Sequence, residues 1–209
     1  MATNLPRLTV VLSEVSKQFG REWIVKKLNY TFEPGKIYGI SGRNGSGKST
    51  VMRLLAAQLS PSRGSVSYTL DGERLHPDKL YHHLSWTGPY IEIVEELTVA
   101  ELLSFHFTLK PALHSLSVEE MLRRIELYPH RNRTLLDCSS GMRQRVLLAT
   151  GLYAATPLLL LDEPTLTLDR QATQWFLDEL GRVSDRRVCI IASNDADDLA
   201  ACTGGIVEL

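Results

Sequence analysis

The sequence predicts an α/β fold in which helices cover both faces of a mostly parallel sheet. Two short segments are typical of buried parallel strands: a run of four leucines at 158–161 and a β-branched, apolar run at 187–192. Residues 171–183 lie between them and carry apolar side chains at helical spacing. The order strand, helix, strand favours parallel pairing, because a parallel partner can be reached only through a crossover connection.

The remaining elements follow from periodicity and turn chemistry along the chain. Predicted strands cover residues 8–12, 23–32, 36–41 and 65–70, and predicted helices cover residues 49–59, 98–109 and 117–127. Ser117 and Glu120 form a capping-box pattern at the start of the last helix. We expect residues 1–209 to form one domain, with an antiparallel N-terminal part and a helical subdomain inserted at about residues 90–145.

Composition excludes several classes of protein. Apolar residues make up 44% of the chain, so it is not a mostly disordered one. The 23 basic and 24 acidic residues nearly cancel, which argues against nucleic-acid binding through bulk charge. No run of about 18 apolar residues predicts a membrane span. The 3 cysteines and 6 histidines lack zinc-ligand spacing, and we expect the cysteines to be reduced and the chain to be cytoplasmic.

The feature that most specifically indicates a function is a glycine-rich loop at residues 42–50, Gly-Arg-Asn-Gly-Ser-Gly-Lys-Ser-Thr. It matches the phosphate-binding pattern G-x-x-x-x-G-K-[ST], with an apolar strand before it and a helix after it. Its glycines let consecutive N–H groups turn towards phosphate oxygens, and the helix presents its positive end to the same anion. The expected nucleotide-binding residues of the loop are Gly42, Asn44, Gly45, Ser46, Gly47, Lys48, Ser49 and Thr50. Lys48 is expected to reach the β- and γ-phosphates and Ser49 to bind Mg²⁺.

Two acidic residues follow the four leucines. Asp162 and Glu163 are predicted to lie at the carboxyl end of that strand, where ligands bind in open α/β sheets. We expect Asp162 to hold Mg²⁺ through water and Glu163 to polarise the water that attacks the nucleotide. Together with the loop, this pair predicts a nucleoside triphosphatase.

Four further segments resemble the ATP-binding subunits of ABC transporters. Residues 138–145, Cys-Ser-Ser-Gly-Met-Arg-Gln-Arg, are similar to the family's L-S-G-G-Q signature, and residues 164–169 are similar to its D-loop. Phe19 precedes Gly42 by 23 residues, at the place where the family stacks an aromatic ring on adenine. Residues 97–101, Leu-Thr-Val-Ala-Glu, resemble the stretch after the family's Q-loop. The four segments occur in family order over nearly the whole chain.

This resemblance implies an architecture and an assembly. It implies a P-loop NTPase core of the RecA-like type, an antiparallel β-subdomain and an inserted α-helical subdomain that docks on a membrane partner. It also implies a head-to-tail dimer, in which each ATP lies between the loop of one chain and the signature of the other. Phe19, Ser139, Gly141 and Asp169 are the residues that it adds to the nucleotide site.

Three departures from the family pattern stand out. Pro89 occupies about the position of the Q-loop glutamine, and no glutamine lies between Gln58 and Gln144. Asn194 occupies the place of the switch histidine; its amide can donate and accept hydrogen bonds but carries no proton near pH 7. The signature has Cys138 for leucine and Met142 for glutamine.

These departures leave more than one function open. The favoured one is an ATP-hydrolysing subunit of a membrane transporter, peripheral on the inner face of the membrane, with a separate permease chain and a dimer partner that is a second copy or a related ATPase. A slow or asymmetric site, a nucleotide-sensing subunit with little turnover, and a soluble ABC-type ATPase without a permease are the alternatives. Residues 21–23 (Arg-Glu-Trp), 89–90 (Pro-Tyr) and 193–195 (Ser-Asn-Asp) resemble a small subgroup of bacterial ABC ATPases of the Bacteroidetes type.

Overall fold

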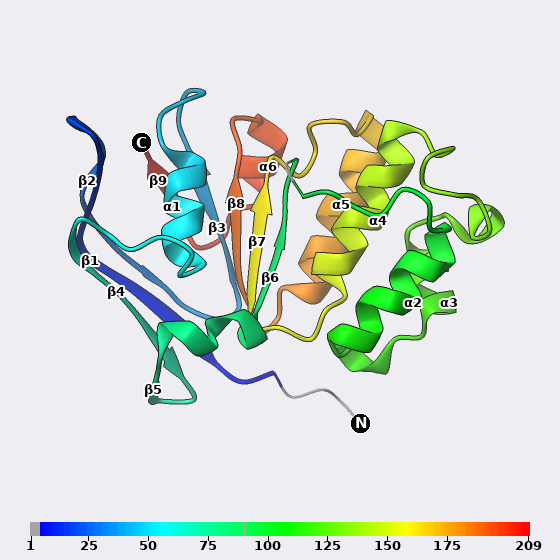
Figure 1. Cartoon of the computed structure of the whole chain (residues 1–209), viewed down its shortest axis with the longest axis horizontal. Coiled ribbons are helices and arrows are strands. Elements are labelled where there is room, and N and C mark those ends of the chain that lie inside the picture. The colour runs from blue at the N-terminus through cyan, green and yellow to red at the C-terminus, as the bar shows by residue number, and fades with distance from the viewer. Residues whose placement is uncertain (1–4, 90) are drawn as a thin grey trace.

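The computed structural model describes residues 5–89 and 91–209, which form two sheets and six α-helices. The first sheet is antiparallel, in the order β2-β1-β4-β5, and the second is parallel, in the order β6-β7-β8-β3-β9 (Figure 1). The strands are β1 (Leu8–Phe19), β2 (Glu22–Phe32), β3 (Lys36–Ser41), β4 (Arg63–Leu70), β5 (Glu73–Leu75), β6 (Leu84–Thr87), β7 (Leu158–Asp162), β8 (Val188–Ala192) and β9 (Ile206–Glu208). The predicted α/β class, with a parallel core and an antiparallel part, is confirmed.

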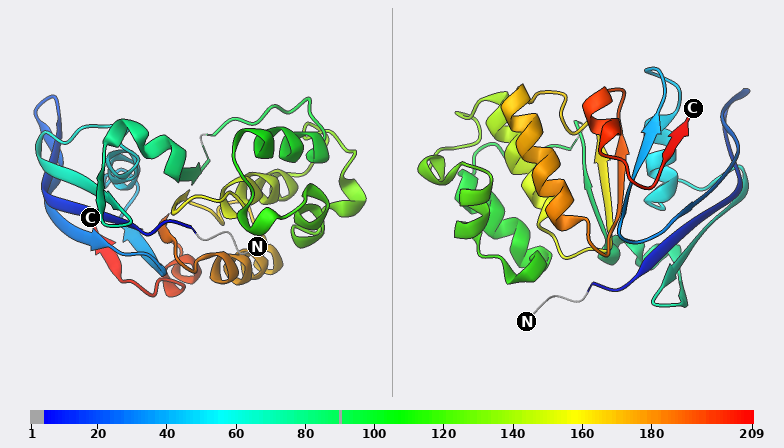
Figure 2. Two further views of the ribbon diagram at one scale, coloured as in Figure 1. Left: turned by 90° about the horizontal axis from the view of Figure 1, so that it is seen from below. Right: turned by 180° about the vertical axis from the view of Figure 1, so that it is seen from behind.

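The helices gather beside and between these sheets. They are α1 (Lys48–Leu55), α2 (Val99–Leu109), α3 (Val118–Arg124), α4 (Ser140–Leu152), α5 (Arg170–Val183) and α6 (Ala196–Ala200), with short 3-10 turns at η1 (Pro77–His83), η2 (Leu113–Ser115) and η3 (Tyr128–His130). Helix α1 lies between the two sheets, whereas α2 to α5 lie on the opposite side of the parallel sheet (Figures 1 and 2). The bounds predicted for the helical subdomain, about 90–145, stay a prediction. None of the helices in residues 5–89 and 91–209 combines the length and apolar character needed to cross a bilayer.

The parallel strands are buried on both faces, because successive side chains of a strand point to opposite sides. Leu158 and Leu160 of β7 pack in the core that includes α1 and the antiparallel sheet. Leu159 and Leu161 pack in the core on the side of α4 and α5. The four-leucine run therefore separates two cores, and it keeps the acidic pair that follows it at a fixed position.

Two predicted helices end earlier than their apolar spacing indicates. Helix α1 ends at Leu55 rather than residue 59, because Ala57 adopts a left-handed conformation (φ 56°). Helix α3 ends at Arg124 rather than residue 127, and Glu126 has φ 60° there. In both places apolar side chains beyond the helix still pack inwards, so that the spacing alone does not mark the end.

The order of the parallel strands positions the site. β8 lies between β7 and β3, and all three strands run in the same direction. Their carboxyl ends therefore meet at one edge of the sheet. The loop after β3 leads into α1, the acidic pair ends β7, and the loop after β8 carries Asn194.

Candidate nucleotide site

The loop between β3 and α1 has the backbone that an anion site requires. Gly42 and Gly47 have φ values of 149° and 110°, and a Cβ on Gly47 would lie 2.6 Å from the Cγ2 atom of Ile24. Helix α1 begins at Lys48 without a side-chain cap and without an acidic residue in its first turn. Its first N–H groups thus face the loop unpaired by side chains, and the positive end of the helix favours a phosphate there.

Lys48 is held at the centre of the site. Its side chain is 7% exposed, and its Nζ donates a hydrogen bond to the carbonyl oxygen of Gly42 at 2.9 Å. The same Nζ lies 3.4 Å from Oε1 of Glu163. A buried ammonium group between a carbonyl and a carboxylate is placed to bind a phosphate oxygen, which offers it the same kind of acceptor.

Ser49 and Asp162 form the oxygen pair that a divalent cation needs. The Ser49 hydroxyl donates to Oδ2 of Asp162 at 3.2 Å. Burial raises the pKa of Asp162 from its ordinary value, while the Ser49 hydrogen bond lowers it. A cation next to a buried carboxylate compensates this cost of burial, and Mg²⁺ prefers oxygen ligands supplemented by water and phosphate. The two residues therefore fit Mg²⁺, although the described residues contain no group of three or more His, Cys, Asp or Glu arranged for a metal.

Glu163 has a conformation that residues with a Cβ seldom adopt. Its φ is 47°, and its backbone N–H donates to the carbonyl of Ala192 at 2.8 Å, which ties it to β8. Its Oε2 accepts a hydrogen bond from the hydroxyl of Ser193 at 3.4 Å. A left-handed residue other than glycine costs of the order of 1 kcal/mol or more, and such strain is concentrated at functional sites.

Asn194 contacts the loop directly. Its Nδ2 donates to Oδ1 of Asn44 at 3.1 Å, so the residue in the switch position and a loop residue 150 positions earlier share a hydrogen bond. Pro89 lines the same cleft, whereas Tyr90 lies outside the described residues.

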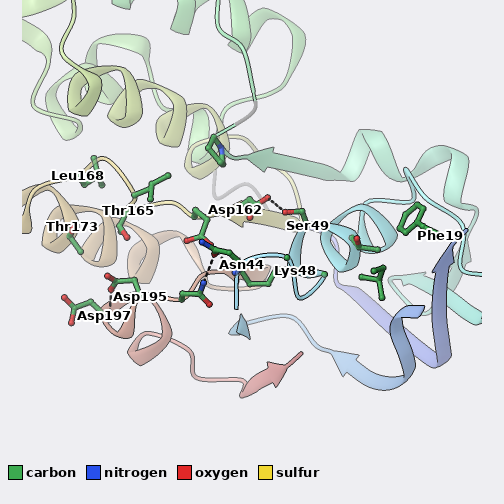
Figure 3. Close-up of a pocket in the computed structure, with 18 residues that line it drawn as sticks. Phe19, Asn44, Lys48, Ser49, Asp162, Thr165, Leu168, Thr173, Asp195 and Asp197 are labelled. Carbon is green, nitrogen blue, oxygen red and sulfur yellow. Dashed lines mark hydrogen bonds and ion pairs between the residues drawn. The ribbon is translucent and has the colours of Figure 1, made fainter. Parts of the chain in front are cut away.

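These side chains surround one cleft of about 1200 Å³ (Figure 3). The predicted residues that line it are Phe19, Asn44, Gly45, Gly47, Lys48, Ser49, Thr50, Asp162, Glu163 and Asn194. Gly42 and Ser46 belong to the loop but do not line the cleft. Phe19, 49% exposed, lies at one end, with the Nζ of Lys17 5.2 Å from the ring centroid, and Thr173 and Asp197 lie at the other end.

Ser139, Gly141 and Asp169 line a different hollow, of about 400 Å³. Ser139 caps α4 by accepting from the N–H of Met142 at 3.2 Å, and Asp169 caps α5 by accepting from the N–H of Ala172 at 2.8 Å. The hydroxyl proton of Ser139 is not needed for the cap, so it is available to a ligand. The chain thus separates the expected signature residues from its own phosphate loop.

The family model described as "ABC transporter" matches residues 25–166, which is more than half of the chain and includes the loop, the signature and the acidic pair. The chain belongs to the ABC transporter family.

Individual relatives of the family agree with this assignment. A sulfate/thiosulfate import ATP-binding protein of Synechocystis is 28% identical over 96% of this chain, and the chain spans 60% of its length. An uncharacterized ABC transporter ATP-binding protein of Bacillus subtilis, YybJ, is 30% identical over 93% of this chain and 89% of its own. A dimeric structure of the ATP-binding cassette MJ0796 in a post-hydrolysis state, with ADP and phosphate, matches with a TM-score of 0.79 at 22% identity, over 96% of this chain and 94% of that one.

Three further residues lie beside this cleft: Thr165 and Ser193 belong to segments that resemble the family but had no individual role predicted for them, and Asp198 carried no signal in the sequence. Thr165, Ser193 and Asp198 are buried next to Glu163, and Thr165 donates to Oδ2 of Asp198 at 3.0 Å. Asp198 belongs to an acidic run, Asp195-Ala-Asp-Asp, of a composition that is typical of a solvent-exposed surface. Only the packing of α6 against β3 reveals that one of its members is inside.

Proposed function

We propose that this chain is the ATP-binding and ATP-hydrolysing subunit of a membrane transporter, that it works as a head-to-tail dimer, and that a separate permease chain crosses the membrane. The observation that carries the proposal is the convergence of three strand ends on one cleft. The loop after β3, the acidic pair after β7 and Asn194 after β8 all line it. Phosphoryl transfer requires a phosphate cradle, an oxygen pair for Mg²⁺ and a group that orients water, and each is present.

Binding of ATP follows from the loop. The phosphates would accept hydrogen bonds from the N–H groups at the start of α1 and from Lys48. Because Lys48 already lies between Gly42 and Glu163, a phosphate oxygen would replace contacts of the same polarity. Phe19 would stack on the adenine at the far end of the cleft.

Hydrolysis requires that a water molecule attack the γ-phosphorus while the bond to the ADP oxygen breaks. Ser49 and Asp162 would hold Mg²⁺, which neutralises charge on the phosphates when it is bound. Glu163, 24% exposed, would accept a hydrogen bond from the attacking water and so orient it. Asn194 would position Asn44 or the γ-phosphate as a neutral amide, because it has no proton to exchange near pH 7.

A dimer accounts for the second hollow. Ser139, Gly141 and Asp169 line a surface separate from the chain's own phosphate loop, so in one chain they have no nucleotide to bind. A second copy turned head to tail would bring its phosphate loop to this hollow. The dimeric MJ0796 cassette has the same overall fold as this chain.

The permease and the location at the inner face of the membrane are proposed from the relatives. The Synechocystis protein is named an import ATP-binding protein, and a bacitracin transport ATP-binding protein of Enterococcus faecalis is 33% identical over 74% of this chain. One name gives sulfate/thiosulfate import and the other bacitracin transport, and this chain spans only 60% and 50% of the two proteins, so the names support transport without indicating a substrate for this chain.

ATP turnover tests the enzyme. We expect Mg²⁺-dependent hydrolysis by the wild-type chain assembled with its permease in membranes, and a loss of about a hundredfold or more in Glu163→Gln. Glu119→Gln is the matched control, because Glu119 lies on the exposed side of α3 and pairs with Arg123. If the assembly binds ATP but does not hydrolyse it, the chain would instead be a nucleotide-sensing subunit. This alternative is considered because Pro89 and Asn194 stand where the family has glutamine and histidine.

Co-purification tests the assembly. We expect a mild-detergent pull-down of the tagged chain to recover a polytopic membrane protein. Recovery of the chain from the cytosol, without a membrane partner but with active turnover, would favour a soluble ABC-type ATPase.

A further inference from the structure

The turn that follows Glu163 is held by contacts to three other elements. The backbone N–H of Glu163 donates to a carbonyl oxygen of β8, and the hydroxyl of Thr165 donates to a buried carboxylate of α6. The third contact comes from α4, where Nε2 of Gln144 donates to the carbonyl oxygen of Pro164 at 2.7 Å. Pro164 is buried, and among the described residues Gln144 supplies the only hydrogen bond to this carbonyl oxygen.

Gln144 belongs to the helix that carries the signature. Helix α4 begins at Ser140, and Gln144 follows one turn later on the same side of the helix. Ser140 lines the hollow that also contains Ser139 and Gly141, where the second chain's nucleotide is proposed to lie. The helix has 13 residues and transmits a displacement as a rigid element, so a shift of its first turn also moves the Gln144 amide. The turn after Glu163 therefore depends on the position of the signature helix.

Glu163 needs this support because its side chain borders two cavities. It lines the nucleotide cleft of about 1200 Å³ and also a hollow of about 550 Å³ that Gln144 lines as well. In the cleft, its Oε1 lies 3.4 Å from Nζ of Lys48, and its Oε2 accepts from the hydroxyl of Ser193 at 3.4 Å. Both contacts are long, so the direction of the carboxylate depends on the backbone that carries it. That backbone is left-handed, with a φ of 47°, and keeps this conformation only while its surroundings hold it.

We propose that Gln144 is a positioning residue for ATP hydrolysis: its amide, from the signature helix, holds the Pro164 carbonyl and so orients Glu163 of the same chain towards the attacking water. The inference rests on the proposed function, because it needs Glu163 as the group that orients water. Loss of the amide leaves a buried carbonyl without a donor, and the turn can regain one only by moving. A small displacement of the group that aligns the water is enough to slow the reaction.

The first experiment compares kcat and KM for ATP in the assembled transporter. Gln144→Met keeps most of the length and volume of the side chain but has no N–H to donate. We expect it to lower kcat about tenfold, which corresponds to about 1.4 kcal/mol, with KM changed by less than about twofold. Gln174→Met is the matched control and should leave kcat unchanged, because Gln174 is exposed on α5 and donates to Asp178 at 2.9 Å.

Mixed dimers distinguish positioning of Glu163 from a general structural effect. One chain carries Glu163→Gln and its partner does not, so that one cleft keeps its water-orienting group, and the rate of a single turnover is measured. Gln144→Met in the chain with intact Glu163 should lower this rate about tenfold. The same substitution in the Glu163→Gln chain should change it by less than about twofold. Poor folding would instead lower the rate in both arrangements, and a displaced signature would lower it in the second, because that chain supplies the signature to the active cleft.

The outcomes separate this inference from the proposed function. No turnover by the wild-type assembly would overturn both. Turnover by the wild type with an unchanged kcat in Gln144→Met would overturn the role of Gln144 alone. A loss that is equal in the two mixed dimers, or confined to the dimer in which Gln144→Met lies in the Glu163→Gln chain, would also overturn that role and leave the proposed function intact.

Discussion

Replacing the fully buried Arg187 with methionine should destabilise the fold, although the residue lies outside the nucleotide site. Arg187 precedes β8 and is 0% exposed. Its Nη1 donates to the carbonyl of Leu152 at 2.7 Å, and its Nη2 donates to the carbonyl of Gly151 at 3.1 Å. These are the last carbonyls of α4, so a buried cation caps the negative end of the helix whose start carries the signature.

The expected cost follows from these contacts. Methionine fills much of the same volume but leaves the carbonyls of Gly151 and Leu152 buried without a donor. Each such group costs about 1–3 kcal/mol. Burial disfavours the charge of Arg187, as its lowered pKa indicates, so removing that charge offsets part of the free-energy cost of the unpaired carbonyls. We expect a net loss of about 3 kcal/mol in the free energy of unfolding, or roughly 6–12 °C in Tm for a chain of this size.

Urea and thermal unfolding of the purified chain measure this loss, with Arg186→Met as the matched control. Arg186 is the preceding residue and is exposed, so its replacement should change stability by less than about 0.5 kcal/mol. A loss of under about 1 kcal/mol in Arg187→Met would refute the reasoning, because it would mean that the two carbonyls are not left unsatisfied.

Three shorter predictions concern other regions. Phe19→Ala should weaken binding of a fluorescent ATP analogue about five- to tenfold while Phe19→Tyr binds normally; equal affinities would place adenine elsewhere. Burial lowers the pKa of His106 below its ordinary 6.5, so its contribution to stability is complete above pH 6.5 and is lost as pH falls through the folded-state pKa. Between pH 7.5 and 5.5 the free energy of unfolding should therefore depend less on pH in His106→Gln than in the wild type. An equal pH dependence in the two proteins would show that His106 does not contribute to it. In Gly64→Ala the new Cβ would lie 2.3 Å from the carbonyl oxygen of Glu14, which should lower the free energy of unfolding by more than about 2 kcal/mol. Gly72 also has a positive φ but faces open space, so Gly72→Ala should lower it by only about 1 kcal/mol. Denaturant titration measures both losses.

Much of the fold could be predicted because its signals are local. The strand at 158–161, the loop at 42–50 and the capped helix after Ser117 each depend on neighbouring residues, and the structure contains all three. The errors also have local causes that the sequence hides. Ala57 and Glu126 end their helices in left-handed conformations that neither residue type favours, so no glycine marks the stop. The sequence does not predict β6, which is only four residues long and lies at the edge of the parallel sheet, because its pairing with β7 stabilises it.

The candidate site also has a part that local sequence predicts and a part that only tertiary packing reveals. The glycines, Lys48 and Ser49 are close together in the chain, and their spacing by itself predicted a glycine-rich loop of the phosphate-binding type before a helix. Three things needed the tertiary structure: the hydrogen bond between Asn194 and Asn44, the separation of Ser139 from the chain's own cleft, and the burial of Asp198. Backbone conformation is set largely by near neighbours, whereas burial and the meeting of side chains are set by how segments far apart in the chain pack. For this reason the sequence alone determined the chemistry of the loop, and only the packing of β3, β7, β8 and α6 decided which acidic residues share the environment of Glu163.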